Sequence, residues 1–480
     1  MAPPVLILCL AFIGWLLRRD IKRRPALGKT LWVPTSVVLM LASRMPSEWL
    51  SALAEGTSLP TNALGKLADQ GFFVISIGLS WYFASSRGVK LRKVLFANTS
   101  LLLFYLYFIC SPLWSGDPAD SLIRILKDFG LTVVVLAAIM SEKQPEEALR
   151  AVFVRCASIL IPLSVFFSRF TFAGFGRTYA LNGAPMITGV NMYKNSLGEM
   201  VMVFGLFLVW DHLETRPANS KWPWSGMRWD VLVLSLMGLY LLKASDSKTS
   251  LVLLLIGLGL IYGRGVFGSR GASTVLFLSV LSLPYPFLSR FSYTVAPALN
   301  AIGRDASFTG RTDIWKHITL TTVNPWVGEG FYNFWGGPGG RAIQAAMQSG
   351  VPNAHNGYLD IFLDGGLIGV ALLGLVFVAS GIELLHNLRV SRYYQFRFTL
   401  LIVAILGGCT ESNFGRMSVL WFVTVLALVE FPFMKGSVTS DRQQQNSTSE
   451  GDRAQLVNVD SYQNASYAHA TIPAVNLDLD

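Results

Sequence analysis

Charged residues are scarce in this sequence. Only 14% of the 480 residues are Asp, Glu, Lys or Arg, whereas 52% are hydrophobic, and the mean hydropathy is +0.47. A composition this apolar excludes a soluble globular protein of ordinary make-up. Cysteine is also rare, and each of the four cysteines stands alone in an apolar run, without the spacing of a disulfide scaffold or a metal site. The chain is therefore expected to be an integral membrane protein.

Short segments of alternating polarity, which a membrane β-barrel requires, do not stand out either. The long apolar runs instead predict helices, because a bilayer forces each spanning segment to satisfy its own backbone hydrogen bonds. We predict an all-α polytopic membrane protein with about 12–13 transmembrane helices and one large periplasmic loop. The predicted spans lie near residues 3–17, 31–46, 70–86, 94–113, 123–140, 150–168, 197–212, 230–244, 249–263, 273–289, 365–385, 397–411 and 415–434.

Lysine and arginine are unevenly distributed between these spans. The tail and the connectors on one side carry 24 of the 39 basic residues, and the positive-inside rule places that side in the cytoplasm. The net charge of +10 therefore reflects topology, and no nucleic acid partner is expected. The loops 169–196 and 290–356 fall on the opposite, periplasmic side. The predicted domains are an N-terminal bundle (1–290), a periplasmic loop (291–356), C-terminal helices (357–435) and a disordered cytoplasmic tail (436–480).

The longest periplasmic loop carries the most polar motifs. It contains GRTDIWKHITL, in which Ile314, Trp315 and Ile318 have the spacing of an amphipathic helix that is expected to lie on the membrane surface. The glycine-rich stretch GEGFYNFWGGPGGR follows and is expected to form a mobile clasp. No HExxH or CxxC motif is present, so a metal-dependent reaction is disfavoured and no cofactor is predicted.

His355 is the sharpest catalytic candidate. It lies in PNAHNGYLD, where a span begins, with Asn356 beside it and Asp360 and Asp364 on the following helix. An imidazole at the water-facing mouth of a helix can take a proton from a sugar hydroxyl at neutral pH, and a carboxylate can orient it. The alternative is that this histidine only caps or packs the helix.

Several basic residues stand on the face that the positive-inside rule disfavours. Each of them could snorkel to the membrane interface. As a set, they predict one outward-facing cationic cavity, because charges near a membrane interior are costly and usually line a site. Such a cavity would suit a polyanion such as a lipid diphosphate. The candidates are Arg177, Lys194, Lys248 and Arg416.

The motifs of this loop resemble a known family. GRTDIW, NPWVGEGFYNF and AHNGYLDIFLDGGLIG together resemble the signature loop of the O-antigen ligase and polymerase superfamily, and MYKNSLG is similar to a KN-x-LG segment of its exopolysaccharide-polymerising branch. The resemblance implies a bacterial inner-membrane enzyme. It would move a glycan from an undecaprenyl-diphosphate carrier to an acceptor hydroxyl at the periplasmic face, with membrane lipids around it and neither nucleotide sugar nor metal.

The resemblance also implies roles for individual residues. His355 matches the loop histidine, a candidate base, and Arg311 matches the arginine expected to contact the donor diphosphate or position the loop. Lys194 and Asn195 match the KN pair, and Asp364 takes the place of the acidic residue before the glycine pair. Asn356 completes the predicted substrate site, with the cationic candidates named above as possible diphosphate ligands.

Inversion at the anomeric carbon is expected, because no paired carboxylates suited to a retaining route are apparent. The class of protein and the acceptor stay open. A lipid-linked glycan flippase or another transporter is the main alternative to an enzyme. Within the enzyme class, the acceptor could be a growing glycan, a lipid A core or a protein, as in protein O-oligosaccharyltransferases.

Overall fold

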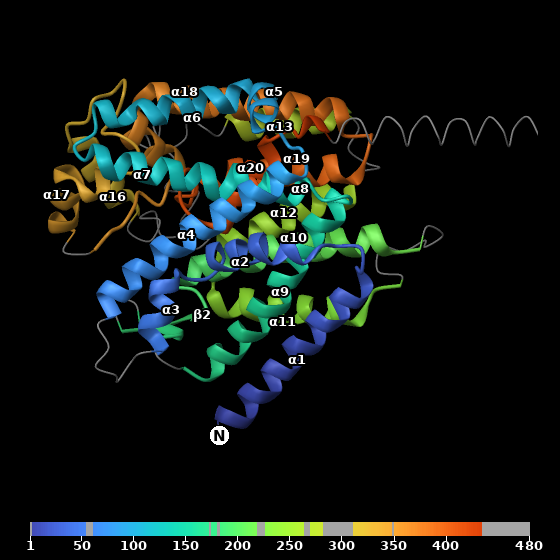
Figure 1. The fold of residues 1–480 in the computed structure, drawn as a ribbon. Coiled ribbons are helices and arrows are strands. Elements are labelled where there is room, and N and C mark those ends of the chain that lie inside the picture. The colour runs from blue at the N-terminus through green and yellow to red at the C-terminus, as the bar shows by residue number, and fades with distance from the viewer. Residues whose placement is uncertain are drawn as a thin grey trace, which may run out of the picture. The chain divides into compact units, whose positions relative to one another are not determined.

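The computed structural model describes residues 2–53, 61–171, 174–179, 183–217, 226–263, 269–281, 311–347 and 350–433. The described residues up to Glu430 form one compact unit, and Phe431–Phe433 belong to a second. The first unit is a helical bundle in which α16 and α17 lie together at one end (Figure 1). This arrangement confirms the predicted all-α class of a polytopic membrane protein.

The N-terminal half of the bundle alternates long helices with short ones. In chain order these are α1 (Ala2–Arg23), η1 (Lys29–Leu31), α2 (Trp32–Leu41), α3 (Pro46–Leu53), α4 (Thr61–Ser86), α5 (Leu91–Ala97), α6 (Thr99–Cys110), η2 (Ser111–Leu113), α7 (Pro118–Phe129), the π-helical turn η3 (Gly130–Val134), α8 (Val135–Met140) and α9 (Pro145–Arg169).

A short hairpin separates this half from the next. The later elements are β1 (Gly176–Tyr179), β2 (Pro185–Gly189), α10 (Lys194–Thr215), α11 (Trp229–Ser245), α12 (Lys248–Tyr262), α13 (Ser269–Leu281), α16 (Arg311–Leu320), η7 (Phe334–Gly336), α17 (Pro338–Ala346), α18 (Gly357–Asn387), α19 (Arg392–Gly408) and α20 (Val419–Leu428).

Each predicted span overlaps a helix in the described part of the chain. Residues 282–289 of the span predicted at 273–289 lie outside the described residues. By length and apolar composition alone, α9, α10 and α18 can cross a membrane, and the pair formed by α5 and α6 makes a fourth span if it counts as one. That pair bends by 105° at Asn98, whose side chain bonds to the backbone of Glu430. Four further apolar helices have only 10–17 residues, namely Lys29–Leu41, Lys248–Tyr262, Arg270–Leu281 and Val419–Leu428.

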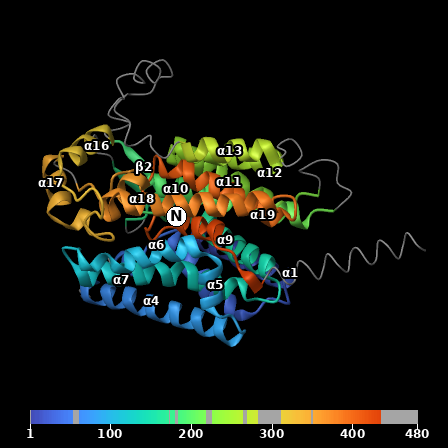
Figure 2. The same cartoon turned by 90° about the horizontal axis from the view of Figure 1, so that it is seen from above.

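The centre of the bundle lies around α9 and α10. Helix α10 packs against α9, α11 and α12, and α19 packs against α12 and α18 (Figure 2). Helix α19 also packs against α20. Aromatic rings fill the contact between α9 and α10, where Phe153 stacks on Phe207 with ring centroids 3.6 Å apart. Both of these side chains are fully buried. Because α10 is held on several sides, the residues at its two ends have fixed neighbours.

The hairpin between α9 and α10 was not foreseen from the sequence. Strands β1 and β2 pair antiparallel, with Arg177 opposite Ile187. Gly176 starts the hairpin at φ +94°, and a Cβ there would lie 2.1 Å from the carbonyl oxygen of Phe167. Only glycine fits this turn, which brings the chain back over the end of α9.

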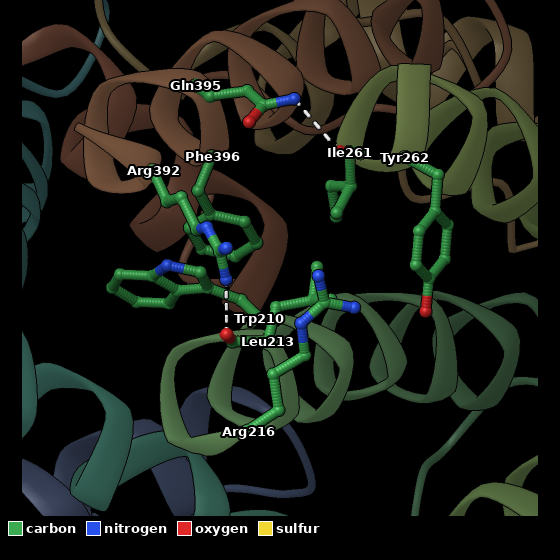
Figure 3. Close-up of a pocket in the computed structure, with 8 residues that line it drawn as sticks. All are labelled: Trp210, Leu213, Arg216, Ile261, Tyr262, Arg392, Gln395 and Phe396. Carbon is green, nitrogen blue, oxygen red and sulfur yellow. Dashed lines mark hydrogen bonds between the residues drawn. The ribbon is translucent and has the colours of Figure 1, made fainter. Parts of the chain in front are cut away.

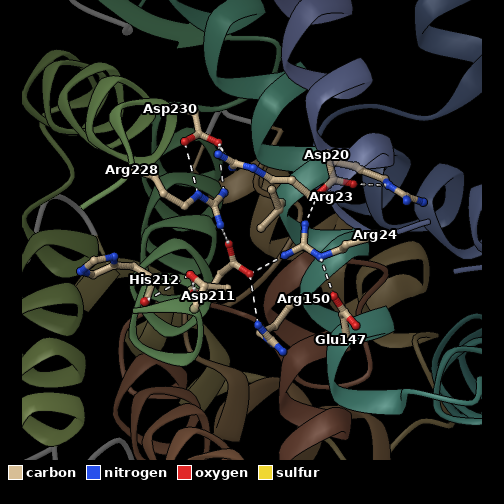
Figure 4. Close-up of polar contacts among 12 residues, drawn as sticks. Asp20, Arg23, Arg24, Glu147, Arg150, Asp211, His212, Arg228 and Asp230 are labelled. Carbon is tan, nitrogen blue, oxygen red and sulfur yellow. Dashed lines mark hydrogen bonds and ion pairs between the residues drawn. The ribbon is translucent and has the colours of Figure 1, made fainter. Parts of the chain in front are cut away.

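Buried ion pairs gather at the far end of α10. Figure 4 shows Asp211 between the guanidinium groups of Arg24, Arg150 and Arg228. Burial alone would lower the pKa of Arg228, but Asp230 and Asp211 outweigh it and raise this pKa above its ordinary value. The network joins three connectors, 18–30, 141–155 and 211–229, that the charge distribution assigned to one side of the membrane. Residues with a common predicted side thus share one end of the bundle.

Candidate active site

The site is organised by a break in α18. Gly366 has φ +60° and ψ −162°, which no L-residue adopts easily, and it interrupts α18 more than two turns after the helix begins at Gly357. A Cβ at this position would lie 2.2 Å from the carbonyl carbon of Trp326. The double glycine of LDGGLIG therefore allows another segment to approach the opened backbone.

The segment Pro325–Gly330 occupies that opening. The amides of Glu329 and Gly330 donate to the carbonyls of Leu363 and Asp364, each at 2.9 Å. In the reverse direction, the amides of Leu367 and Ile368 donate to the carbonyls of Pro325 and Trp326. The backbone groups that the kink frees are thus satisfied by the loop. The stretch predicted as a mobile clasp is bonded to α18 at its start, and it continues into helix α17.

An apolar cluster holds α16 against this loop. Ile314, Trp315 and Ile318 are each 5–6% exposed and pack with Phe334 and Trp335. The predicted helix is present at Arg311–Leu320, but its apolar face packs within the protein and not on a membrane surface. The indole of Trp315 donates to the carbonyl of Ala354 at 2.9 Å, which joins α16 to the residue before His355.

His355 itself sits on a strained turn. Its φ is +48°, a left-handed conformation that costs free energy in any residue other than glycine. The backbone around it is fixed from both sides, since its own amide donates to the side chain of Asn353 at 3.0 Å. The ring is 35% exposed, so it is reachable from outside the bundle.

Three of the predicted site residues meet at Glu411, in the connector between α19 and α20. Arg311 donates to one carboxylate oxygen of Glu411 at 2.8 Å, and Asn195 donates to the same oxygen at 3.0 Å. The other oxygen lies 3.9 Å from Nδ1 of His355. Glu199, one turn after Asn195 on α10, is close enough to interact electrostatically with Glu411 and Arg311. Four segments far apart in the sequence therefore build one polar cluster.

The sequence suggested that a nearby carboxylate on the following helix orients His355. In the structure, neither Asp360 nor Asp364 does so. Asp364 pairs with Arg416 at 2.9 Å, and Asp360 lies 3.7 Å from the same guanidinium. Asp360 also accepts the indole N–H of Trp335 and the amide of Ala354. Asp360 and Asp364 lie one and two turns after the start of α18, where their side chains face Arg416 and the loop. Glu411 takes the position beside His355.

Arg416 is buried among several partners. Its guanidinium lies 4.0 Å from the ring centroid of Tyr332, and Arg124 lies 4.3 Å from the same ring. The ring therefore stacks with two cations, one from the last connector and one from α7. Arg416 is only 9% exposed and faces two carboxylates, which would compete with a diphosphate for its guanidinium. Its role as a diphosphate ligand stays a prediction.

The remaining predicted residues lie around the cluster. Asn356 caps α18, where its side chain accepts the amides of Tyr358 and Leu359. Lys194 is 4.0 Å from Asp246, and the exposed Lys248 starts α12 beside that turn. Arg177 donates to the carbonyl of Ser168 from the hairpin. Asn356 thus stabilises the start of α18, whereas Lys194 and Lys248 stay accessible as candidate diphosphate ligands.

Glu411 was missed by the sequence reasoning. It stands in ESNFGRMS, the same short connector in which Arg416 drew attention. The rule that made Arg416 conspicuous, the cost of a charge between two spans, applies equally to a carboxylate. Among the described residues, no three His, Cys, Asp or Glu side chains are placed to hold a metal ion. The metal-independent chemistry stays a prediction.

The fold and this cluster define a class: a polytopic helical membrane protein with an Arg, His and Glu constellation beneath a structured loop. Comparison with known proteins agrees with that class. A family model described as O-antigen ligase matches residues 231–374, which include Arg311 and His355. The exopolysaccharide production protein ExoQ of Rhizobium meliloti (strain 1021) is 27% identical over 305 residues, covering 61% of this chain and 67% of that protein. Both matches support the O-antigen ligase and polymerase superfamily and confirm the resemblance seen in the motifs.

Proposed function

We propose that this protein is a membrane glycan transferase of the O-antigen ligase and exopolysaccharide polymerase type. It would move a glycan from an undecaprenyl-diphosphate carrier to an acceptor hydroxyl at the periplasmic face. The observation that carries the proposal is the meeting of Arg311 and His355 at Glu411, although Arg311 and Glu411 are 100 residues apart in sequence. The relative named for exopolysaccharide production favours a growing glycan as the acceptor.

His355 acts as the general base in this proposal. Glu411 faces Nδ1, so the other ring nitrogen is the one that receives the proton of the acceptor hydroxyl. The distance of 3.9 Å is longer than a hydrogen bond, and such contacts commonly tighten when substrate binds. As the imidazole becomes protonated, the carboxylate beside it stabilises the positive charge and keeps the ring in place.

Cationic residues act on the donor. The acceptor oxygen forms a bond to the anomeric carbon, while the bond from that carbon to the diphosphate oxygen breaks and the diphosphate leaves with the electron pair. Neutralising that charge makes the diphosphate a good leaving group. Arg311 is 14% exposed and uses one N–H on Glu411, and a guanidinium has five such donors. Lys194 and Lys248 lie at the same end of the bundle and supply further positive charge.

The test compares wild type with His355→Ala and His355→Gln in a strain that lacks the endogenous gene. Each variant must first reach wild-type levels in the membrane. We expect carrier-linked single repeat units to accumulate and polymer to disappear, with transfer reduced by a factor of about 100 or more. Wild-type polymer from both variants would contradict the proposal. Loss of carrier translocation with intact transfer would indicate a flippase.

Sidedness has its own test. Lys316 is exposed on α16, close to the site, and Arg389 is exposed after α18, at the opposite end. In a cysteine-free background, Lys316→Cys should react with a membrane-impermeant maleimide added to intact spheroplasts. Arg389→Cys should react only after permeabilisation. The reverse pattern would remove the periplasmic reaction from the proposal.

A further inference from the structure

A second polar pocket lies at the other end of the bundle. Its volume is about 210 Å³, and it is open on one side and lined by the C-terminal ends of α10 and α12 and the first turns of α19. Figure 3 shows the guanidinium groups of Arg216 and Arg392 approaching this space from two different helices. Among the eight described residues that line it, none is acidic. The pocket is thus a cationic depression distinct from the site around Glu411.

The helix ends around the pocket are arranged for a negative ligand. The backbone carbonyls at the C-terminal ends of α10 and α12 would repel an anion if they were left without hydrogen-bond donors. Arg392 donates to the carbonyl of Leu213, and Gln395 donates to the carbonyls of Leu260 and Ile261 at 2.9 Å. These two side chains cover the carbonyls that would oppose binding. The N-terminal turn of α19, which has the favourable end of its dipole here, contributes Arg392, Gln395 and Phe396 to the lining.

The rest of the lining is aromatic. Trp210 stacks on Phe396 with ring centroids 4.4 Å apart, and Tyr262 stands at the end of α12. Arginines beside aromatic rings form an amphipathic surface, with hydrogen-bond donors for a phosphate and apolar area for the carbon chain attached to it. Inorganic phosphate would use only the first of these two features.

The position of the pocket matches a membrane boundary. Helix α10 has 22 residues, which span about 33 Å and so roughly the hydrocarbon core of a bilayer. The cluster around Glu411 contacts the first turn of α10, and the pocket lies at its last turn. A ligand in the pocket therefore cannot reach His355. The connectors next to it, 211–229 and 385–397, are those predicted to face the cytoplasm.

We propose that this pocket binds a phosphate group, supplied by the headgroup of an anionic phospholipid in the leaflet on that side. The phosphate contacts Arg216 and Arg392, and the glycerol and upper acyl region contact Tyr262 and the Trp210–Phe396 stack. The bound lipid would tie the ends of α10, α12 and α19 together. This inference does not depend on the glycan transfer proposed above.

The test measures lipid binding to delipidated, detergent-solubilised full-length protein by native mass spectrometry. The probes are phosphatidylglycerol, phosphatidylcholine and inorganic phosphate. The variants are Arg216→Gln and Arg392→Gln, with Arg392→Lys to retain the charge. Arg389→Gln is the matched control, because it removes an exposed positive charge three residues away without lining the pocket.

We expect phosphatidylglycerol to bind wild type and Arg389→Gln equally. Binding to Arg216→Gln and Arg392→Gln should be at least about tenfold weaker, since each loses charge-assisted hydrogen bonds. Arg392→Lys should recover part of the affinity. Equal binding by all variants, or equal binding of phosphatidylcholine, would overturn the proposal. Binding of inorganic phosphate but not phosphatidylglycerol would support the phosphate site and overturn the lipid as its source.

Discussion

Glu411 offers the sharpest separation between stability and catalysis. Glu411→Gln removes the charge that faces Arg311 while it keeps the size of the side chain. The pair is largely buried, with the two side chains 14% and 10% exposed. Removing one partner of a buried ion pair costs about 3–5 kcal/mol, and the partial exposure places this case near the lower limit, at about 3 kcal/mol. In addition, His355 loses the carboxylate beside its ring, so transfer should fall by a factor of about 100.

The chain contains a matched pair for the control. Arg87 and Glu142 form a similar ion pair of 2.5 Å, with the two side chains 25% and 8% exposed, at the end predicted to be cytoplasmic. Glu142→Gln should cost a comparable free energy of unfolding and leave the transfer rate per folded molecule unchanged. The free energy is measured by equilibrium unfolding in mixed detergent, and transfer by conversion of a carrier-linked donor.

A double-mutant cycle completes this prediction. Arg311→Gln and Glu411→Gln together should cost less than the sum of the single changes, by about 1–3 kcal/mol, because the second change removes a partner that is already unpaired. Additivity within about 0.5 kcal/mol would show that the two side chains do not interact. A Glu411→Gln variant with wild-type transfer would refute the role given to this carboxylate.

Further predictions concern the supports of the site. Gly366→Ala should destabilise the protein by more than about 3 kcal/mol, since the new Cβ meets backbone at 2.2 Å, whereas Gly374→Ala, with nothing within 4 Å, should be tolerated in a melting experiment. Asp364→Asn should cost about 3–5 kcal/mol by leaving Arg416 buried without its closest partner, whereas Asp246→Asn, 73% exposed, should change stability by less than about 0.5 kcal/mol. Transfer by the purified protein should persist in EDTA, and loss of activity that Mg²⁺ restores would contradict the metal-independent reaction.

The positions of the spans could be predicted because each depends on a local property. An apolar run long enough to cross a bilayer forms a helix wherever it lies in the chain, and the helix at Arg311–Leu320 followed from the spacing of Ile314, Trp315 and Ile318. The kink at Gly366 could not be predicted in the same way. The kink depends on a long-range contact, because Pro325–Gly330 forms hydrogen bonds with the backbone that the kink opens.

The site was predictable only in part, for a related reason. The loop motif pointed to Arg311 and His355, and in the structure both contact Glu411. Their common partner Glu411 comes from another connector, and sequence spacing carries no information about such long-range contacts. Conversely, Asp360 and Asp364 are near His355 in sequence but bond to Trp335 and Arg416. Proximity along the chain was therefore a poor guide to which carboxylate faces the imidazole.

The most direct measurement is glycan transfer by the purified protein reconstituted in vesicles with an undecaprenyl-diphosphate-linked repeat unit as donor. Wild type and Glu142→Gln should form longer glycan at equal rates per folded molecule, and His355→Ala should form almost none. Undiminished elongation by His355→Ala, with its fold intact, would contradict the assignment of this cluster as the reaction site.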